Sequence, residues 1–120
     1  MVLTQKPSQR DLERWIFAGE IDERMTFNQK VWAACSRIPR GKVATYSDLA
    51  HAVGSTGYRA VGNAMNKNPY APRVPCHRVV GSDGALTGYA GGLAKKRRML
   101  QEEGVRLIGD KVDLSYRAEL

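Results

Sequence analysis

The chain has 120 residues, of which 19 are lysine or arginine and 12 are aspartate or glutamate, so its formal net charge is +7. This length suits one domain with one core, and no stretch approaches the roughly 20 apolar residues that a membrane-spanning helix needs. The N-terminal residues include no apolar segment of the secretory kind, and two cysteines are too few for a disulfide scaffold. We therefore expect a cytoplasmic (nucleoid-associated) or nuclear protein with free thiols and no metal site, and a positive charge that favours a polyanionic partner.

The first 25 residues are more polar than the rest and form an expected N-terminal extension, residues 1–25. Apolar side chains at helical spacing predict one short amphipathic helix over 8–18, with Gly19 as its stop. These side chains are Leu12, Trp15 and Ile16. We expect this helix to dock on the body of the protein as a lid or brace.

The main domain, residues 26–120, is expected to begin with a stronger helix. Thr26 and Gln29 form a T-x-x-Q capping box, which satisfies unpaired amides at a helix start. Pro39 and Gly41 should end this helix. The apolar face consists of Phe27, Val31, Ala34, Cys35 and Ile38. Because Cys35 lies inside this stripe, we interpret it as a small core residue and not as a nucleophile.

Two further short helices follow in a helix-turn-helix pattern. The first starts at a second capping box, Thr45 with Asp48, and the second runs over 58–66 after a short turn at 55–57. The second helix is rich in small residues, namely Ala60, Gly62 and Ala64. They would allow either a close approach to another surface or close packing against a neighbouring helix, and the pattern favours neither.

In the C-terminal half, the sequence predicts a last helix over 93–103 that ends at Gly104. The segments 105–107 and 112–114 alternate in polarity around a Gly-Asp turn, which indicates a small hairpin, the wing of a winged helix. The basic run 95–98 is typical of a solvated helix face, with a DNA contact as the alternative.

The main chemical feature is Cys76, which is followed directly by His77. A thiolate is the nucleophilic form of cysteine, and an adjacent base that accepts the thiol proton raises its population. A histidine base needs its second ring nitrogen held by an acceptor. The acidic residues downstream are Asp83, Glu102 and Glu103. Glu103 falls where the dipole of the last helix disfavours a carboxylate, so pairing with His77 would account for it.

The segment 75–80, Pro-Cys-His-Arg-Val-Val, resembles the active-site signature of the O6-alkylguanine-DNA alkyltransferases (methylated-DNA–protein-cysteine methyltransferases). The similarity is to the family's C-terminal, active-site domain and extends over 27–104. The other matching residues are Tyr46, Leu49-Ala50, the run 59–65, Asn68-Pro69, Gly84, the run 89–93, Lys96, Leu100 and Glu103-Gly104. The resemblance implies a mainly α fold, a winged helix-turn-helix-like DNA-binding domain with a small C-terminal β-hairpin.

The resemblance also implies a reaction that needs no cofactor. Cys76 would take the alkyl group from O6 of guanine and keep it as a thioether, so each molecule would react once. His77 would accept the thiol proton through a water molecule, and Glu103 would orient His77 and stabilise the imidazolium. Asn68 would hydrogen-bond within the site and connect the recognition helix to Cys76.

The implied partner is double-stranded DNA containing O6-alkylguanine, with the damaged nucleotide flipped out of the stack because a buried O6 cannot reach a thiolate. The residues implied to contact DNA are Tyr46, Ser47, Arg59, Ala60, Gly62 and Ser82. Tyr46 and Ser47 would hold a phosphate, and Arg59 would fill the space that the flipped nucleotide leaves. The small residues of the recognition helix fit a minor groove only about 6 Å wide.

The flipped base would lie in a pocket between Met65 and Tyr89. Its edge would be read by the Val79 carbonyl and by the amides of Tyr89 and Ala90. Ala90 stands where some family members have serine, which would weaken one base contact.

Family members carry an additional N-terminal domain, and we expect the 25 residues before the match to be too few for it. The alkyltransferase-like proteins are similarly short; they bind the flipped lesion without transferring its alkyl group and signal it to nucleotide excision repair. Their mark is Trp or Ala at the position of Cys76. Three hypotheses are therefore open: alkyl transfer by a monomer, a non-catalytic lesion sensor, and a winged-helix regulator in which Cys-His is structural. A thiol beside a base favours the first.

Overall fold

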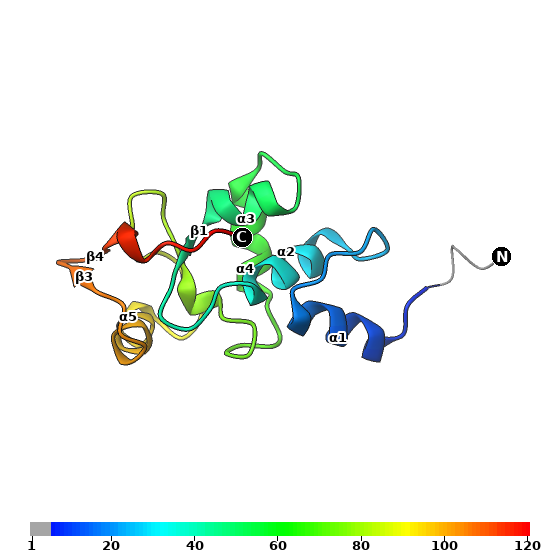
Figure 1. The fold of residues 1–120 in the computed structure, drawn as a ribbon, viewed down its shortest axis with the longest axis horizontal. Helices are drawn as coiled ribbons and strands as arrows, with labels where there is room; N and C mark the ends of the chain where they lie inside the picture. Colours follow the sequence, from blue (N-terminus) through cyan, green and yellow to red (C-terminus); the bar gives the residue numbers. More distant parts are fainter. Residues whose placement is uncertain (1–5) are drawn as a thin grey trace.

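The computed structural model describes residues 6–120, and within them the fold is mainly helical, as the sequence predicts. The elements are α1 (Gln9–Ala18), α2 (Phe27–Ser36), β1 (Ala44–Thr45), α3 (Tyr46–Ala52), α4 (Tyr58–Asn66), the 3₁₀ helix η1 (Cys76–Arg78), β2 (Val79–Val80), α5 (Leu93–Glu102), β3 (Leu107–Ile108), β4 (Lys111–Val112) and the 3₁₀ helix η2 (Leu114–Tyr116). Helix α1 lies at one end of the molecule and the β3–β4 hairpin at the other (Figure 1). Residues 1–5 of the expected N-terminal extension lie outside the described residues.

Helices α1, α2 and α3 each begin at a capping box. In this motif the side chain of the cap residue accepts the backbone amide of the third helical residue, whose own side chain accepts the backbone amide of the cap. The boxes are Ser8 with Asp11 in α1, Thr26 with Gln29 in α2, and Thr45 with Asp48 in α3. The predicted starts of α2 and α3 are confirmed. Helix α2 ends at Ser36, before the expected stop at Pro39. Phe27 is 36% exposed, so its assignment to the buried stripe was wrong, because a side chain at the first helical position has no preceding turn beside it.

The larger core lies among α1, α2, α3 and α4. Ile16 of α1 is buried in it together with Val31, Leu49 and Val61, one from each of the next three helices. Cys35 is fully buried in the same core, which confirms its interpretation as a packing residue. A second, smaller core lies under α5 and the hairpin. It consists of Val43, Val80, Leu100, Val105 and Val112.

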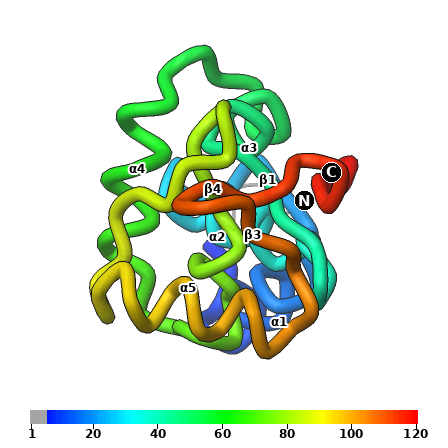
Figure 2. Tube along the Cα trace, turned by 90° about the vertical axis from the view of Figure 1, so that its left-hand side faces the viewer, coloured from blue at the N-terminus to red at the C-terminus, as the bar shows by residue number. Residues whose placement is uncertain are grey.

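A short parallel pairing connects the helix-turn-helix to the segment that carries Cys76. Strand β1 leads directly into α3 and pairs with β2, which follows η1, in the register Ala44 with Val79. The C-terminal segment adds to the other side, because the Val43 amide donates to the Tyr116 carbonyl at 3.0 Å and the Ala118 amide donates to the Val43 carbonyl at 2.8 Å. Figure 2 looks onto this part of the molecule from the hairpin end.

The predicted wing is present as an antiparallel hairpin, β3 with β4, turning at Gly109-Asp110. It is shorter than the sequence suggests, with two residues in each strand. Gly84 packs against it, and its carbonyl accepts the Val112 amide at 2.8 Å. A Cβ atom at Gly84 would lie 2.4 Å from the Val112 carbonyl oxygen, so this close approach requires glycine.

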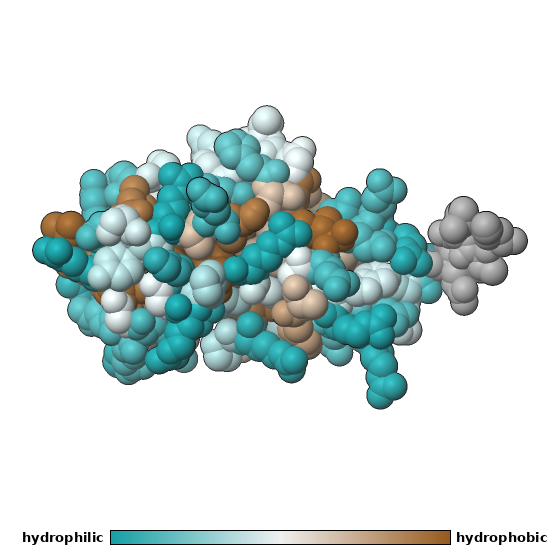
Figure 3. Space-filling view, viewed as in Figure 1, coloured by the Kyte–Doolittle hydropathy of each residue, from teal (hydrophilic) through white to brown (hydrophobic). Residues whose placement is uncertain are grey.

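Within residues 6–120, no helix combines the length and the apolar character that crossing a membrane requires. Hydrophilic side chains predominate on the face drawn in Figure 3, and the hydrophobic ones form small separate groups. This surface offers charged and polar contacts more than a broad apolar face.

Candidate active site

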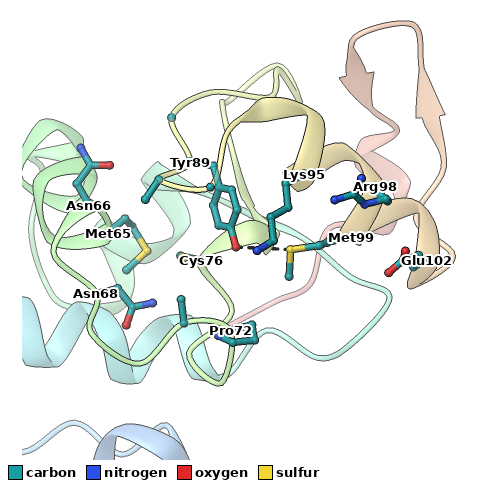
Figure 4. A pocket seen from close by; sticks show the side chains of 14 residues that line it. Met65, Asn66, Asn68, Pro72, Cys76, Tyr89, Lys95, Arg98, Met99 and Glu102 are labelled. Atoms are coloured by element: carbon teal, nitrogen blue, oxygen red, sulfur yellow. Dashed lines mark hydrogen bonds between the residues drawn. The ribbon is translucent and has the colours of Figure 1, made fainter.

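Cys76 begins the 3₁₀ helix η1, which interrupts the chain between a long loop and β2. The turn is tight, because the Cys76 amide donates to the Val74 carbonyl at 2.9 Å across Pro75. The Cys76 side chain is half-buried and lines a cavity of about 390 Å³ (Figure 4). The nucleophile candidate is therefore accessible from a cavity, whereas the thiol of Cys35 is enclosed in the core, where burial raises its pKa.

The walls of this cavity come from α4, the loop before Cys76, the glycine-rich loop 87–92 and α5. Several side chains predicted to form the site line it together with Cys76. They are Met65, Asn68, Tyr89 and Ala90. Segments far apart in the sequence therefore form one pocket, and the base contacts that the resemblance implies for its residues stay predictions.

His77 lies behind this cavity in a buried ion-pair network. Its side chain is 2% exposed, and its Nε2 lies 2.8 Å from Oε2 of Glu103. Arg78 donates to the same carboxylate from Nε at 2.8 Å and from Nη2 at 2.9 Å. A carboxylate only accepts, so Nε2 carries the hydrogen. Nδ1 makes no hydrogen bond among the described residues and is the nitrogen left to accept a proton.

The protonation states of this network suit a base. Burial lowers the pKa of His77 and outweighs the opposing effect of the Glu103 carboxylate. Burial alone would raise the pKa of Glu103, but hydrogen bonds from Arg78 and His77 lower it to about 2. At neutral pH the site therefore holds a neutral imidazole on an ionised carboxylate, which is the pairing that a general base requires.

Of the three acidic candidates, Glu103 forms the hydrogen bond to His77. Asp83 instead forms an ion pair with Lys111 at 3.0 Å. Glu102 lines the cavity and makes no hydrogen bond to His77. Glu103 reaches His77 because it caps the C-terminal end of α5, which packs against η1.

Asn68 joins the end of α4 to the turn at Cys76. Its amide donates to the Met65 carbonyl at 3.2 Å, and its Nδ2 donates to the Val74 carbonyl at 3.0 Å, two residues before Cys76. Its Oδ1 accepts the Tyr70 amide at 2.9 Å. Asn68 therefore connects the end of α4 to the turn at Cys76 through hydrogen bonds to the backbone, and the role that the resemblance implies for it stays a prediction.

Tyr46 and Ser47 occupy the first two positions of α3, after the cap Thr45. The Tyr46 hydroxyl donates to the Thr87 carbonyl at 3.2 Å, so this side chain faces the glycine-rich loop beside the cavity. Burial raises its pKa, which keeps the phenol neutral. The phosphate contacts expected of Tyr46 and Ser47 stay predictions.

The small residues of α4 differ in their surroundings: some are open to another surface, and one packs against a neighbouring helix. Arg59 and Ala60 are exposed, and a Cβ atom at Gly62 would meet nothing within 4 Å, so this part of the helix is open to another surface. Ala64 is fully buried, and its carbonyl accepts Trp32 Nε1 at 2.8 Å. One face of the helix is thus exposed and the other is packed in the core.

Lys96 contradicts the prediction of a solvated basic run at 95–98. It is fully buried, and its Nζ donates to the Val79 carbonyl at 2.5 Å and to the Thr87 carbonyl at 2.7 Å. Burial lowers its pKa to about 8. Lys96 is buried because of the tertiary structure: β2 and the glycine-rich loop each direct one carbonyl to the same point under α5. Sequence reasoning missed this role; the only signal was that Lys96 belongs to the matching pattern.

The remaining predicted residues are placed as follows. Val79 is fully buried and does not line the cavity, so its carbonyl, already bound by Lys96, would read a base only through its second lone pair. Ala90 is exposed and lines the cavity. Ser82 is exposed in the turn that precedes Gly84, the residue that packs against the hairpin. Their contacts to base and backbone stay predictions.

Comparison with known protein families shows to which family the chain belongs. A family model described as the DNA binding domain of 6-O-methylguanine DNA methyltransferase matches residues 26–105, more than half of the chain. The chain belongs to this family. The resemblance inferred from the 75–80 signature is therefore confirmed.

Two methyltransferases of this family illustrate the similarity in sequence. A methylated-DNA--protein-cysteine methyltransferase of Mycobacterium tuberculosis is 47% identical over 96 residues, covering 78% of this chain and 58% of its own length. One of Methanosarcina barkeri is 45% identical over 103 residues, covering 78% of this chain and 65% of its own length. The chain therefore spans less than two thirds of these relatives.

Solved structures of the family give the same fold. Mycobacterium tuberculosis OGT in complex with DNA has a TM-score of 0.63 and 44% identity, covering 78% of this chain and 64% of that one. Schizosaccharomyces pombe Atl1, in complex with damaged DNA containing O6-carboxymethylguanine, has a TM-score of 0.68 and 33% identity, covering 78% of this chain and 95% of that one. These similarities confirm the winged helix-turn-helix-like fold of the methyltransferase domain.

Proposed function

We propose that this protein repairs double-stranded DNA by transferring the alkyl group of a flipped O6-alkylguanine to Cys76. It would act as a methylated-DNA–[protein]-cysteine S-methyltransferase that reacts once. The observation that carries the proposal is the arrangement at the cavity: Cys76 lines it, and the buried His77 beside it has Nε2 held by Glu103 and Nδ1 left to accept a proton.

The step follows from this arrangement. The Cys76 thiol loses its proton to His77 Nδ1 through a water molecule, and Glu103 stabilises the imidazolium. The thiolate then attacks the alkyl carbon, so an S–C bond forms while the C–O6 bond breaks. The electron pair of the broken bond stays on guanine, which takes up a proton. The thioether has no neighbouring group that reverses the step, so the protein is consumed.

The test is an intact-mass measurement after incubation with a duplex oligonucleotide carrying one O6-methylguanine. We expect the protein to gain one methyl group, located on the peptide containing Cys76. Cys76→Ala should abolish the gain, and Cys35→Ala, which removes the buried thiol, should keep it. Tight binding of the damaged duplex with no change in mass would refute the transfer.

That negative result would support the second candidate, a non-catalytic lesion sensor. The similarity to Atl1 favours it as the alternative, because this chain covers 95% of that structure. A sensor would bind the flipped O6-alkylguanine and present it to nucleotide excision repair proteins. Cys76 in place of Trp or Ala is the feature that argues for transfer.

The surface for duplex DNA is the exposed face of α4, which ends at the cavity with Met65 and Asn66. Arg59 and Ala60 lie on this face, and a monomer would suffice because one copy supplies both face and cavity. A DNA partner of this kind would put the protein in the cytoplasm, associated with the nucleoid, or in the nucleus.

Arg59→Ala is expected to weaken binding of the damaged duplex about tenfold, because it removes a cation from the face that meets the phosphates and the orphaned base. Fluorescence anisotropy at several salt concentrations would measure it, and the dependence of affinity on salt should become shallower. Arg10→Ala removes an equally charged, exposed side chain from α1 and serves as the control. Equal losses in the two variants would refute the assignment of α4 as the DNA-binding face.

A further inference from the structure

Lys95 lines the cavity and has no part in the proposed transfer. In Figure 4, Tyr89 and Pro72 lie on opposite sides of a slot that opens from Cys76, and Lys95 and Met99 of α5 lie at its far end. A Cβ atom at Gly91 would lie 2.8 Å from the Tyr89 ring and 3.1 Å from Lys95 Cδ. The Lys95 stem therefore passes beside Gly91 and the Tyr89 ring, and its exposed side chain lines the cavity.

The Lys95 amine makes no hydrogen bond or ion pair with another described residue. This sets it apart from Lys96, whose amine binds two carbonyls, and from Arg97, whose Nη1 donates to the Gly109 carbonyl at 2.9 Å. The other charged residues at the cavity are Arg98 and Glu102, which lie beyond Lys95 from Cys76 in Figure 4. For an alkyl group that extends from Cys76 into the slot, the nearest charged side chain is therefore a cation.

The size of the alkyl group decides whether it meets this charge. A methyl group on O6 ends at Cys76, where the new S–C bond forms. In the proposed geometry a longer group extends past Cys76 into the slot between Tyr89 and Pro72, where Lys95 is the first charged side chain. A cation that meets a carboxylate in a partly solvated site attracts it enough to favour it several-fold, whereas a neutral end group gains no such attraction.

We propose that Lys95 is a specificity-determining residue that favours O6-alkyl groups ending in a carboxylate, of which carboxymethyl is the smallest. The inference rests on the proposed function of the same pocket. In the reaction, the Cys76 thiolate attacks the methylene carbon, the C–O6 bond breaks, and guanine keeps the electron pair and takes up a proton. The carboxylate is not altered and leaves with the methylene as S-carboxymethylcysteine.

The experiment compares two lesions of the same shape, O6-carboxymethylguanine and its neutral amide counterpart, O6-carbamoylmethylguanine, each in the same duplex. Single-turnover rate constants for modification of Cys76 are measured for both, and their ratio is compared between proteins. We expect the ratio of carboxymethyl to carbamoylmethyl to fall about fivefold in Lys95→Met. The ratio should be restored in Lys95→Arg and unchanged in Lys6→Met, which removes the same charge from the N-terminal segment.

The ratio cancels both the different intrinsic reactivity of the two lesions and any general loss of DNA affinity. The same pair of lesions is also bound to proteins that carry Cys76→Ala, so that the ratio of dissociation constants is obtained without reaction. Transfer that proceeds with a ratio independent of Lys95 overturns this inference and leaves the transfer function intact. No transfer, with a binding ratio that still depends on Lys95, overturns the reaction and supports the inference. Equal ratios in both measurements overturn the inference.

Discussion

Replacing Glu103 with glutamine is expected to slow methyl transfer to Cys76 about a hundredfold. The Glu103 carboxylate holds His77 Nε2 at 2.8 Å with only 7% of its side chain exposed, so no solvent takes over its role. An amide can still accept that hydrogen bond, but it has no charge with which to stabilise the imidazolium. Single-turnover kinetics followed by intact mass would measure the loss. Binding of the damaged duplex should persist, since Glu103 lies behind the cavity and not on α4.

The same variant should also change how stability depends on pH. The folded-state pKa of Glu103 is about 2, below the ordinary value of 4.5. Its stabilising contribution is therefore present above pH 4.5 and is lost as the pH falls from 4.5 to about 2, by about 3 kcal/mol in total. Urea denaturation across this window should give a shallower acid loss for Glu103→Gln than for the parent protein. The exposed Glu20→Gln is the matched control; an identical acid loss in all three proteins would contradict the paired carboxylate.

The elements that the sequence predicted well are those governed by local chemistry. The boxes at Thr26 and Thr45 set helix starts through bonds that span three residues, and both are in place. The pairing of Glu103 with His77 was predicted because a carboxylate at a helix C-terminus needs a compensating partner, and the structure places the two at 2.8 Å.

The features that the sequence did not reveal depend on distant segments meeting. Strands β1 and β2 have two residues each. They pair residues that are 35 positions apart, Ala44 with Val79, so no local sequence pattern predicts them. Lys96 sits in a basic run that suggests solvent exposure, and only the convergence of the Val79 and Thr87 carbonyls makes it a core residue. Long-range geometry, not residue type, determined both outcomes.

Tyr70 is a third such feature and links helix α1 to the loop beside the candidate site. Its ring packs edge-on against Phe17 of α1 at 5.2 Å and against Trp32 of α2 at 5.9 Å between centroids. Its hydroxyl accepts Gln9 Nε2 at 3.1 Å, and its amide donates to Asn68 Oδ1 at 2.9 Å. Helix α1 therefore contacts the loop that leads to Cys76. These are contacts of the kind that a brace would make.

Tyr70→Ala is accordingly expected to lower the free energy of unfolding by about 3 kcal/mol, because it removes two aromatic contacts and leaves a gap between α1 and α2. Transfer to Cys76 should also slow about tenfold at temperatures where the variant is fully folded, since the loop that positions the thiol loses its anchor. Urea denaturation and single-turnover kinetics would measure the two effects.

Tyr70→Phe separates the ring from the hydroxyl, because it keeps both aromatic contacts and removes the hydroxyl that accepts from Gln9, an exposed side chain. We expect it to lose less than about 1 kcal/mol and to transfer at the parental rate. If Tyr70→Ala lost stability but reacted as fast as the parent protein, α1 would support the fold without positioning Cys76. If both variants slowed equally, the hydroxyl bond to α1, and not the packing of the ring, would be what positions the loop.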